Sequence, residues 1–471
     1  MNDIAPTPRH ATLFGHPVGL AWLTVCEFFE RFSFYGMQNL LALYLTGLLL
    51  LPGHVERIIG VGAMRAMLEG VYGAHTPVTM TAGILGLYTG FVYLTPIIGG
   101  WIADRFIGRT AAVTIGALTM AAGHFLMAFE ASFLLAIGCM LVGVGFFKGN
   151  IASQLGDLYE KGDARRDDAY QVFLLSVQVA VVVSPLVTGS LGEKVGFHWG
   201  FGAAGVGMLA GLLVYLRARP TLPPEPARGA VAREARPPLT ALERRNFVLL
   251  ACMVPIFSLA MVGNQQFFVA YVLWAKRSME LNFFGFDMPV TWLFAIAAVL
   301  SSASIVVSMA FWRWWARRWK EPDELLKISL GIALAACGPL VLAAASAVVA
   351  SSGHKVGLAW SLVYELVGDL GFANVFPIGL ALYSRIAPKG WSSVMAGTFF
   401  VHLFFANLFV GKLGGLLETM SGAAFWEMHS AIVASAAVLL LVVRATWGRS
   451  LARDYAPSGS EVLSGAPVGT T

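Results

Sequence analysis

Charged residues are scarce in this chain of 471 residues, at 13% of the total. Soluble domains carry about a quarter charged residues, so the composition excludes an ordinary soluble enzyme or binding domain. Hydrophobic residues make up 57% of the chain instead, and they gather in runs long enough to cross a bilayer. The sequence therefore predicts an integral membrane protein with many helical spans.

Cysteine is also rare, with four residues that all lie in apolar runs and form no Cys-x-x-Cys pair. This spacing argues against disulfides and against a metal site, and we expect the cysteines to be small buried fillers. We expect no cofactor. The net charge of +5 belongs to loops, so it gives no reason to expect a nucleic-acid partner. The four residues are Cys26, Cys139, Cys252 and Cys337.

The apolar runs predict about twelve membrane helices in two sets of six. A spanning helix needs roughly 20 mainly apolar residues. The first run is too long for the core of a signal peptide, so we expect it to remain as a helix. The predicted spans are 18–50, 78–101, 111–129, 132–156, 169–192, 198–216, 246–274, 289–312, 325–350, 358–385, 391–417 and 424–444.

A stretch rich in Pro, Ala and Arg separates the two sets and predicts a flexible basic connector. Thr240 to Glu243 has the pattern of a capping box before the seventh span, and a short helix is expected around Val55–Tyr72. The expected division is an N-terminal segment 1–17, a first bundle 18–216, a linker 217–245, a second bundle 246–445 and a tail 446–471.

The positions of Lys and Arg predict the orientation. With the N-terminus inside, the large majority of the 32 Lys and Arg residues fall in loops on that side. Cytoplasmic loops carry the excess of positive charge. We therefore expect both termini in the cytoplasm and a multi-pass protein of the plasma membrane, which in a bacterium is the inner membrane.

The first span carries three ionisable residues, Glu27, Glu30 and Arg31. A helix places them at i, i+3 and i+4, so their side chains share one face. An ionised group in lipid is costly and is kept where it faces a partner or a water-filled path. The cluster is either a static ion pair between helices or a proton carrier, since two carboxylates one turn apart repel when both are ionised. Lys148, in another span, could bridge to a carboxylate.

Between the second and third spans, residues 99–109 read Gly-Gly-Trp-Ile-Ala-Asp-Arg-Phe-Ile-Gly-Arg. This run resembles the G-x-x-x-D-R-x-G-R-[RK] loop of the major facilitator superfamily, with one additional residue before Gly108. Charge contacts that form in one conformation and break in another suit a gate; a tight positive turn that fixes the topology is the alternative. The expected gating residues are Gly100, Asp104, Arg105, Gly108 and Arg109.

The cluster on the first span resembles the E-x-x-E-R-F-x-Y-Y-G signature of the proton-dependent oligopeptide transporter (POT) family, with Phe34 in place of the first Tyr. The resemblance continues at Tyr93 in the second span and at Lys148 and Asn150 in the fourth, and it covers about residues 17–445. The residues that match the signature are Glu27, Glu30, Arg31, Phe32, Tyr35 and Gly36.

This resemblance implies an all-α major facilitator fold, with about twelve helices in two six-helix bundles around a central cavity. It implies a proton-coupled symporter that imports di- or tripeptides, or a peptide-like solute with a carboxylate, by alternating access. Glu27, Glu30, Arg31 and Lys148 would couple proton entry to import, and Arg31 and Lys148 would meet the carboxylate. The implied partners are protons, the small peptide or peptide-like substrate and the lipid bilayer, and a monomer is expected.

Several positions at which this family holds its ligand differ here. Gln38 stands where an arginine is usual, Gln178 stands where an asparagine is usual, and Asn264 stands where a glutamate often precedes Gln-Gln. In the tenth span, Phe372 and Phe376 take the places of a glutamate that would face a peptide's amino end and of a serine.

Glu365 and Asp369 lie seven and three residues before Phe372, on the same helical face. Either one of them replaces the missing glutamate, displaced toward the outside, or both line the external vestibule. Aromatic residues could form a wall for a more apolar ligand, and His402 could titrate near neutral pH or be a packed side chain. The residues expected to bind the substrate are Arg31, Tyr35, Gln38, Tyr93, Lys148, Asn150, Gln178, Asn264, Trp292, Asp369, Phe372, Phe376, Phe399 and His402.

Two other classes of function stay open from the sequence. One is a major facilitator antiporter that exports drugs or organic ions in exchange for protons, and the other is a peptide sensor that does not transport. An enzyme is not expected, because the charged groups at mid-membrane include no evident nucleophile or metal set.

Overall fold

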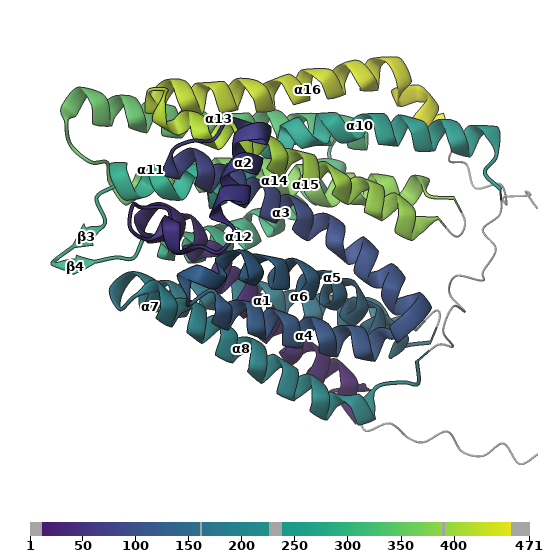
Figure 1. Cartoon of the computed structure of the whole chain (residues 1–471). Coiled ribbons are helices and arrows are strands. Elements are labelled where there is room, and N and C mark those ends of the chain that lie inside the picture. Colours follow the sequence, from purple (N-terminus) through teal and green to yellow (C-terminus); the bar gives the residue numbers. More distant parts are fainter. Residues whose placement is uncertain (1–11, 161–162, 226–237, 389–390, 454–471) are drawn as a thin grey trace, which may run out of the picture.

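The computed structural model describes residues 12–160, 163–225, 238–388 and 391–453, and these residues form almost only helices (Figure 1). Parts of the predicted N-terminal segment, linker and tail, namely residues 1–11, 226–237 and 454–471, lie outside the described residues. The second half begins earlier than predicted, because α10 starts at Ala241 rather than near 246.

The long helices of the first half pack against one another, with α1 between α6 and α8 and with α5 between α3 and α4. Three of them end in a π-helical turn: Leu45–Leu49 after α1, Ala103–Ile107 after α3 and Pro185–Gly189 after α6. The helices are α1 (Val18–Tyr44), α3 (Pro77–Ile102), α4 (Arg109–Leu126), α5 (Phe133–Asp157), α6 (Arg165–Ser184) and α8 (Phe197–Ala218).

The second half repeats this plan around α13, which packs on both α14 and α16. Its long helices are α10 (Ala241–Gln265), α12 (Trp292–Ala316), α13 (Glu324–Ser352), α14 (Leu358–Ile386), α15 (Ser392–Gly414) and α16 (Gly422–Arg453). The shorter elements are α2 (Val61–Tyr72), α7 (Ser190–Lys194), α11 (Ala270–Ser278) and two antiparallel hairpins, β1 (Thr12–Leu13) with β2 (His16–Pro17) and β3 (Asn282–Phe283) with β4 (Phe286–Asp287).

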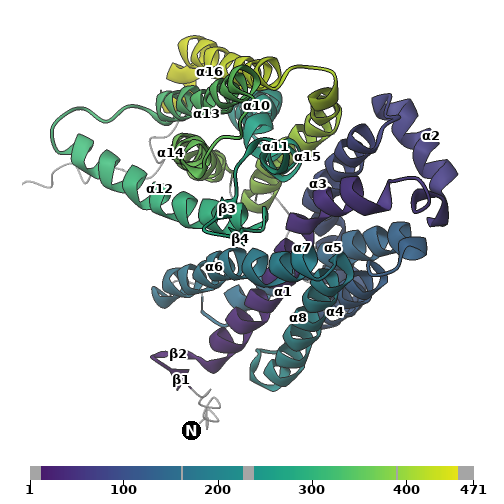
Figure 2. The same ribbon diagram turned by 90° about the vertical axis from the view of Figure 1, so that its left-hand side faces the viewer.

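The predicted membrane architecture is confirmed. Ten helices of the described residues are long and apolar enough to cross a membrane. The helices α1 and α4 pack among them and complete two groups of six, which Figure 2 shows end-on. We call one end of the bundle the α2 end, since it carries α2 and the β3–β4 hairpin, and the other the linker end, since α8 leaves it and α10 enters it (Figure 1).

Local sequence explains where several helices begin. The predicted capping box at α10 is confirmed: the Thr240 side chain accepts a hydrogen bond from the Glu243 amide at 3.2 Å, and the Glu243 carboxylate accepts one from the Thr240 amide at 2.8 Å. The predicted short helix is α2, which is shorter than expected because Gly60 and Gly73, both with positive φ, bound it.

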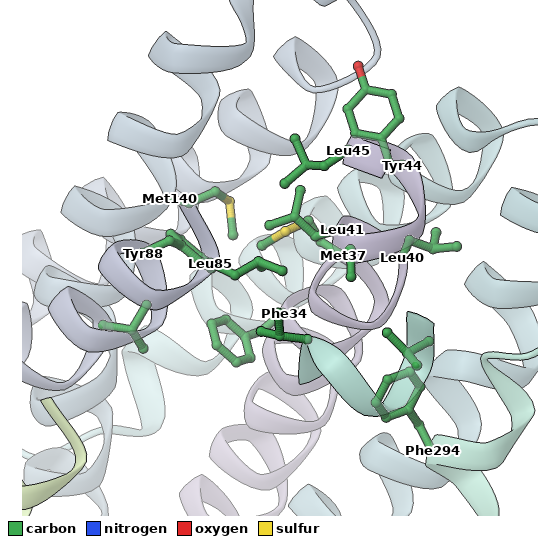
Figure 3. Packing of buried hydrophobic residues seen from close by; sticks show 14 of the residues in the cluster. Phe34, Met37, Leu40, Leu41, Tyr44, Leu45, Leu85, Tyr88, Met140 and Phe294 are labelled. Carbon is green, nitrogen blue, oxygen red and sulfur yellow. The ribbon is translucent and has the colours of Figure 1, made fainter. Parts of the chain in front are cut away.

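The apolar core of the first half extends to the second half around α1. Figure 3 shows Phe34, Met37 and Leu41 of α1 beside Leu85 and other buried residues of α3 and α5. Phe294 of α12 belongs to the same buried cluster. The charged face of α1 is therefore held on a helix whose other faces are fixed by packing.

The two halves are sealed together at the α2 end. Glu193 of α7 accepts hydrogen bonds from the amides of Val290 and Thr291 at 3.0 and 2.8 Å and from the Thr291 hydroxyl at 2.6 Å. Gly86 of α3 lies so close to α15 that a Cβ there would be 2.6 Å from the Gly411 Cα. Between described residues, the hydrogen bonds that join the halves lie at this end or about halfway along the bundle.

Candidate functional site

The three charged residues of α1 form one buried ion cluster. Arg31 binds Glu30 through two hydrogen bonds, one from Nη2 at 2.7 Å and one from Nε, and its Nε also lies 3.1 Å from a Glu27 carboxylate oxygen. Glu30 is fully buried, and Glu27 and Arg31 are 5% and 4% exposed. The other carboxylate oxygen of Glu27 has no hydrogen-bond partner among the described residues. A buried pair of this kind is unstable if one partner is removed.

Lys148 of α5 completes this region without joining the ion pair. Its ammonium lies 5.5 Å from the centre of the Tyr93 ring of α3, and it has no carboxylate within ion-pair distance in the described chain. The bridge to a carboxylate that the sequence suggested is therefore absent in this conformation. Lys148 and Tyr93 line a small cavity, with about 430 Å³ of empty space including its mouth, together with Arg31, Tyr35 and Gln38. The positive charges of Lys148 and Arg31 can therefore contact a ligand in this small cavity.

A larger cavity, with about 1170 Å³ of empty space including its mouth, lies between the two halves. The first half contributes four residues to its wall: Tyr35 and Asn39 from α1, and Gln178 and Val181 from α6. Tyr35 and Phe268 also line the small cavity, so the two spaces adjoin. The structure thereby brings together these predicted binding residues: Arg31, Tyr35, Gln38, Tyr93, Lys148, Gln178, Asn264, Asp369 and Phe372.

The acidic part of the large cavity comes from α14. Glu365 and Asp369 both line it and are 7% and 8% exposed. One oxygen of each carboxylate has no hydrogen-bond partner among the described residues. Both acids therefore face the cavity between the two halves.

Five predicted binding residues lie outside both cavities. Asn150 donates to the Phe146 carbonyl of its own helix at 2.7 Å, and Trp292 donates to Ser190 at 2.8 Å in the α2-end seal. The other three, Phe376, Phe399 and His402, pack in an aromatic cluster behind Phe372. His402 is therefore surrounded by packed aromatic side chains. None of these five residues is part of the proposed site.

The predicted gate is a charge network at the linker end. Arg109 binds Asp104 at 3.1 Å and Asp157 of α5 at 2.6 Å, and the Arg105 guanidinium lies 5.9 Å from the Trp101 ring. Gly108 has φ 84° and ψ 156°, a conformation that suits only glycine. A Cβ on Gly100, also expected to act here, would meet open space.

This loop has one residue more than the superfamily pattern. The π-helical turn Ala103–Ile107 accommodates that residue. A π-helical turn accommodates one residue more than an α-helical turn. Asp104 and Arg109 therefore still meet, and the departure from the motif leaves the charge network intact.

Sequence reasoning did not select Asn39, Asp157 or Glu193. Asn39 follows Gln38 in an apolar run, and only the packing shows that it faces the cavity. Glu193 follows the fifth predicted span, and an acid at a span end is ordinary. Asp157 was the most accessible to prediction, because it follows Lys148 on the same helix and lies near the basic loop.

Comparison with known proteins agrees with this geometry. The model of the POT family matches residues 110–236. The chain is 28% identical to the peptide transporter YePEPT of Yersinia enterocolitica subsp. palearctica, over 94% of this chain and 97% of that one. It is 24% identical to a di-/tripeptide transporter of Lactococcus lactis subsp. cremoris, over 94% and 98%.

Solved structures show the same arrangement of helices. A peptide transporter POT in complex with sulfate superposes with a TM-score of 0.79 at 24% identity, over 93% of this chain and 97% of that one. A variant of peptide transporter POT in complex with alafosfalin gives 0.76 at 25% identity, with the same coverage.

The fold and the inward-facing charges of α1 define a major facilitator type of membrane protein. Within that class, the chain is similar to proteins of the POT family, whose model matches part of it.

Proposed function

We propose that this chain is a proton-coupled symporter that imports di- or tripeptides, or a peptide-like solute with a carboxylate. The observation that carries the proposal is the buried Glu27–Glu30–Arg31 cluster, which reaches a cavity between two helical bundles through Arg31 and Tyr35. Relatives that span nearly the whole chain are peptide transporters. Charges held inside a membrane bundle are expected on ion and substrate paths.

The carboxylate of Glu30 and the carboxylate of the ligand would compete for Arg31, so that proton binding to Glu30 favours ligand binding. A proton that reaches Glu30 neutralises the carboxylate that now holds the guanidinium with two hydrogen bonds. Arg31 is then free to bind the carboxylate of an incoming peptide, for which its planar group can supply two donors. Release of the proton to the other side restores the Arg31–Glu30 pair and expels the ligand's carboxylate.

The ligand would lie between opposite charges. Lys148, which has no carboxylate partner in the described chain, joins Arg31 at the carboxylate end. Asp369 faces the amino end from α14, in place of the glutamate that the family carries at the position of Phe372. The rings of Phe268, Phe294 and Phe372 supply the apolar wall for the ligand's side chains.

The conformation fits one half of an alternating-access cycle. We assign the sealed α2 end to the outside and the linker end to the cytoplasm, with both termini inside and the protein in the bacterial inner membrane. Asp104, Arg105 and Arg109, with Gly100 and Gly108, would rearrange when the linker end closes. The cavity lies within one chain, so a monomer is the proposed working unit.

Transport by purified protein in proteoliposomes tests the proposal. An inward proton gradient should drive accumulation of a radiolabelled tripeptide, and a protonophore should abolish it. Accumulation only under an outward gradient would identify an antiporter, and peptide binding without accumulation would identify a sensor. Either of these two results would overturn the proposed symport.

A further inference from the structure

The large cavity contains a side-chain amide without a described hydrogen-bond partner, and the proposed function gives this amide no role. Asn39 lies on α1, is 1% exposed and lines the large cavity. Neither its amide nitrogen nor its amide oxygen has a hydrogen-bond partner among the described residues. Leaving a buried polar group unpaired costs about 1–3 kcal/mol, so an amide held in this way is suited to a ligand.

The acids of α14 present the same feature from the other half of the molecule. Glu365 and Asp369 are each more than nine-tenths buried, and each has one oxygen without a described partner. The residues that line this cavity include no Lys or Arg. Two buried carboxylates one turn apart without a cation are costly, and a ligand's ammonium group would remove part of that cost.

Asn39 and Asp369 lie at the same depth. The helix that contains α1 ends at the α2 end at Leu49, about 15 Å beyond Asn39, and α14 starts there at Leu358, about 16 Å before Asp369, at 1.5 Å per residue. Glu365 lies one turn nearer to that end. The amide of Asn39 and the carboxylate of Asp369 therefore line one level of the large cavity from opposite halves, and the carboxylate of Glu365 lines it one turn nearer to the α2 end.

The opposite charge lies deeper along the same helix. Arg31 precedes Asn39 by two turns, which corresponds to about 12 Å along the axis of α1. An extended chain spans about 3.3–3.6 Å per residue. Three residues match that distance, whereas two residues fall short of it by several ångströms.

We propose that Asn39 and Glu365, together with Asp369, form a subsite for the ligand's ammonium group, and that its distance from Arg31 makes this chain select tripeptides over dipeptides. The inference rests on the proposed function and narrows its substrate class. It assigns binding roles to Asn39 and Glu365. Neither residue belongs to the charged signature of α1, and neither stands at a position where the family usually carries an acid.

Binding of trialanine and dialanine to the full chain in lipid nanodiscs, measured by calorimetry, tests the proposal. Trialanine should bind about tenfold more tightly than dialanine, since one charge-assisted hydrogen bond accounts for a difference of that order. Asn39→Ala and Glu365→Gln should each remove most of this preference by weakening trialanine binding. N-acetylated trialanine, which has no ammonium group, should bind the unaltered chain no better than dialanine.

Glu69→Gln, on the exposed face of α2 outside the cavity, is the matched control and should bind both peptides as the unaltered chain does. Equal affinity of the unaltered chain for the two peptides would overturn the proposed selection by length, and so would variants that weaken both peptides to the same extent. Failure of both peptides to bind a folded, unaltered chain would instead overturn the proposed peptide transport.

Discussion

At the scale of single residues, a tight ion pair within α1 lies near a cation of α5 that has no carboxylate partner among the described residues. Glu30 and Arg31 are hydrogen-bonded to each other within the helix, whereas the Lys148 ammonium lies over the Tyr93 ring and lines the small cavity. The sequence was sufficient to find these residues, because ionisable side chains stand out in an apolar run. It could not identify Asn39, because an amide in an apolar run becomes informative only when its partners, or their absence, are known.

Glu30→Gln should stop proton-driven accumulation. A proton moving through 100 mV supplies about 2.3 kcal/mol, enough for a gradient of roughly fifty-fold, and a glutamine cannot carry that proton. Counterflow exchange of labelled for unlabelled tripeptide needs no net proton movement and should persist. The two assays in proteoliposomes distinguish loss of coupling from loss of folding, and undiminished acid-driven uptake would remove Glu30 from the proton path.

Lys148→Ala should weaken binding of a ligand carboxylate by about ten- to a hundredfold, since a hydrogen bond to a charged group is worth about 1.5–3 kcal/mol. Lys148→Arg keeps the positive charge and serves as the matched variant, for which a smaller loss is expected. Calorimetry with a tripeptide and with its C-terminal amide measures the effect. If Lys148→Ala weakened the binding of both ligands equally, the proposed role of Lys148 in carboxylate binding would be wrong.

At the scale of elements, the order and type of the helices followed from apolar runs and caps. The capping box at Thr240 and the helix α2 are examples in which local sequence decides the structure. The π-helical turns after α1, α3 and α6 were not predicted. They depend on contacts with neighbouring helices, and the apolar pattern of a single helix contains no record of those contacts.

The contact of α3 with α15 offers a test at this scale. Gly86→Ala places a Cβ against the Gly411 backbone, and overpacking of this kind costs about 1–3 kcal/mol. We expect the helices to separate at the α2 end and the outward-open population to grow. Labelling of a cysteine introduced between α3 and α15 measures that population. Gly138→Ala on α5, where a Cβ would meet nothing within 4 Å, should leave labelling unchanged; equal labelling of both variants would refute this role of the contact.

At the scale of the whole molecule, the two halves are joined mainly at the α2 end. The sequence predicted two sets of six spans but not which end would be closed, because both conformations of an alternating-access protein share one set of helices. Glu193 contributes three hydrogen bonds to the seal and is therefore a natural point at which to shift the balance.

Glu193→Gln should favour the outward-open state, because an amide oxygen accepts more weakly than a carboxylate. Distances between spin labels on α7 and α11, measured by pulsed electron resonance, should lengthen. Glu130→Gln lies at the same end but loses contacts only within the first half, with His54 and Arg57, so its distances should match those of the unaltered chain. Unchanged distances in Glu193→Gln would show that the seal does not depend on this carboxylate.

The spacing of Arg31 and Asn39 along α1 has a consequence for how this protein could diverge. Substitutions at either residue change how tightly one end of a ligand is held, but the separation is set by the pitch of a helix and stays constant. Inserting a residue between them would add only about 1.5 Å and would swing Asn39 around the axis by about 100°, away from the cavity. A shift in preferred cargo size would then require a whole extra turn in α1. Gradual mutation would therefore change the affinity for a ligand far more readily than the length of ligand that fits.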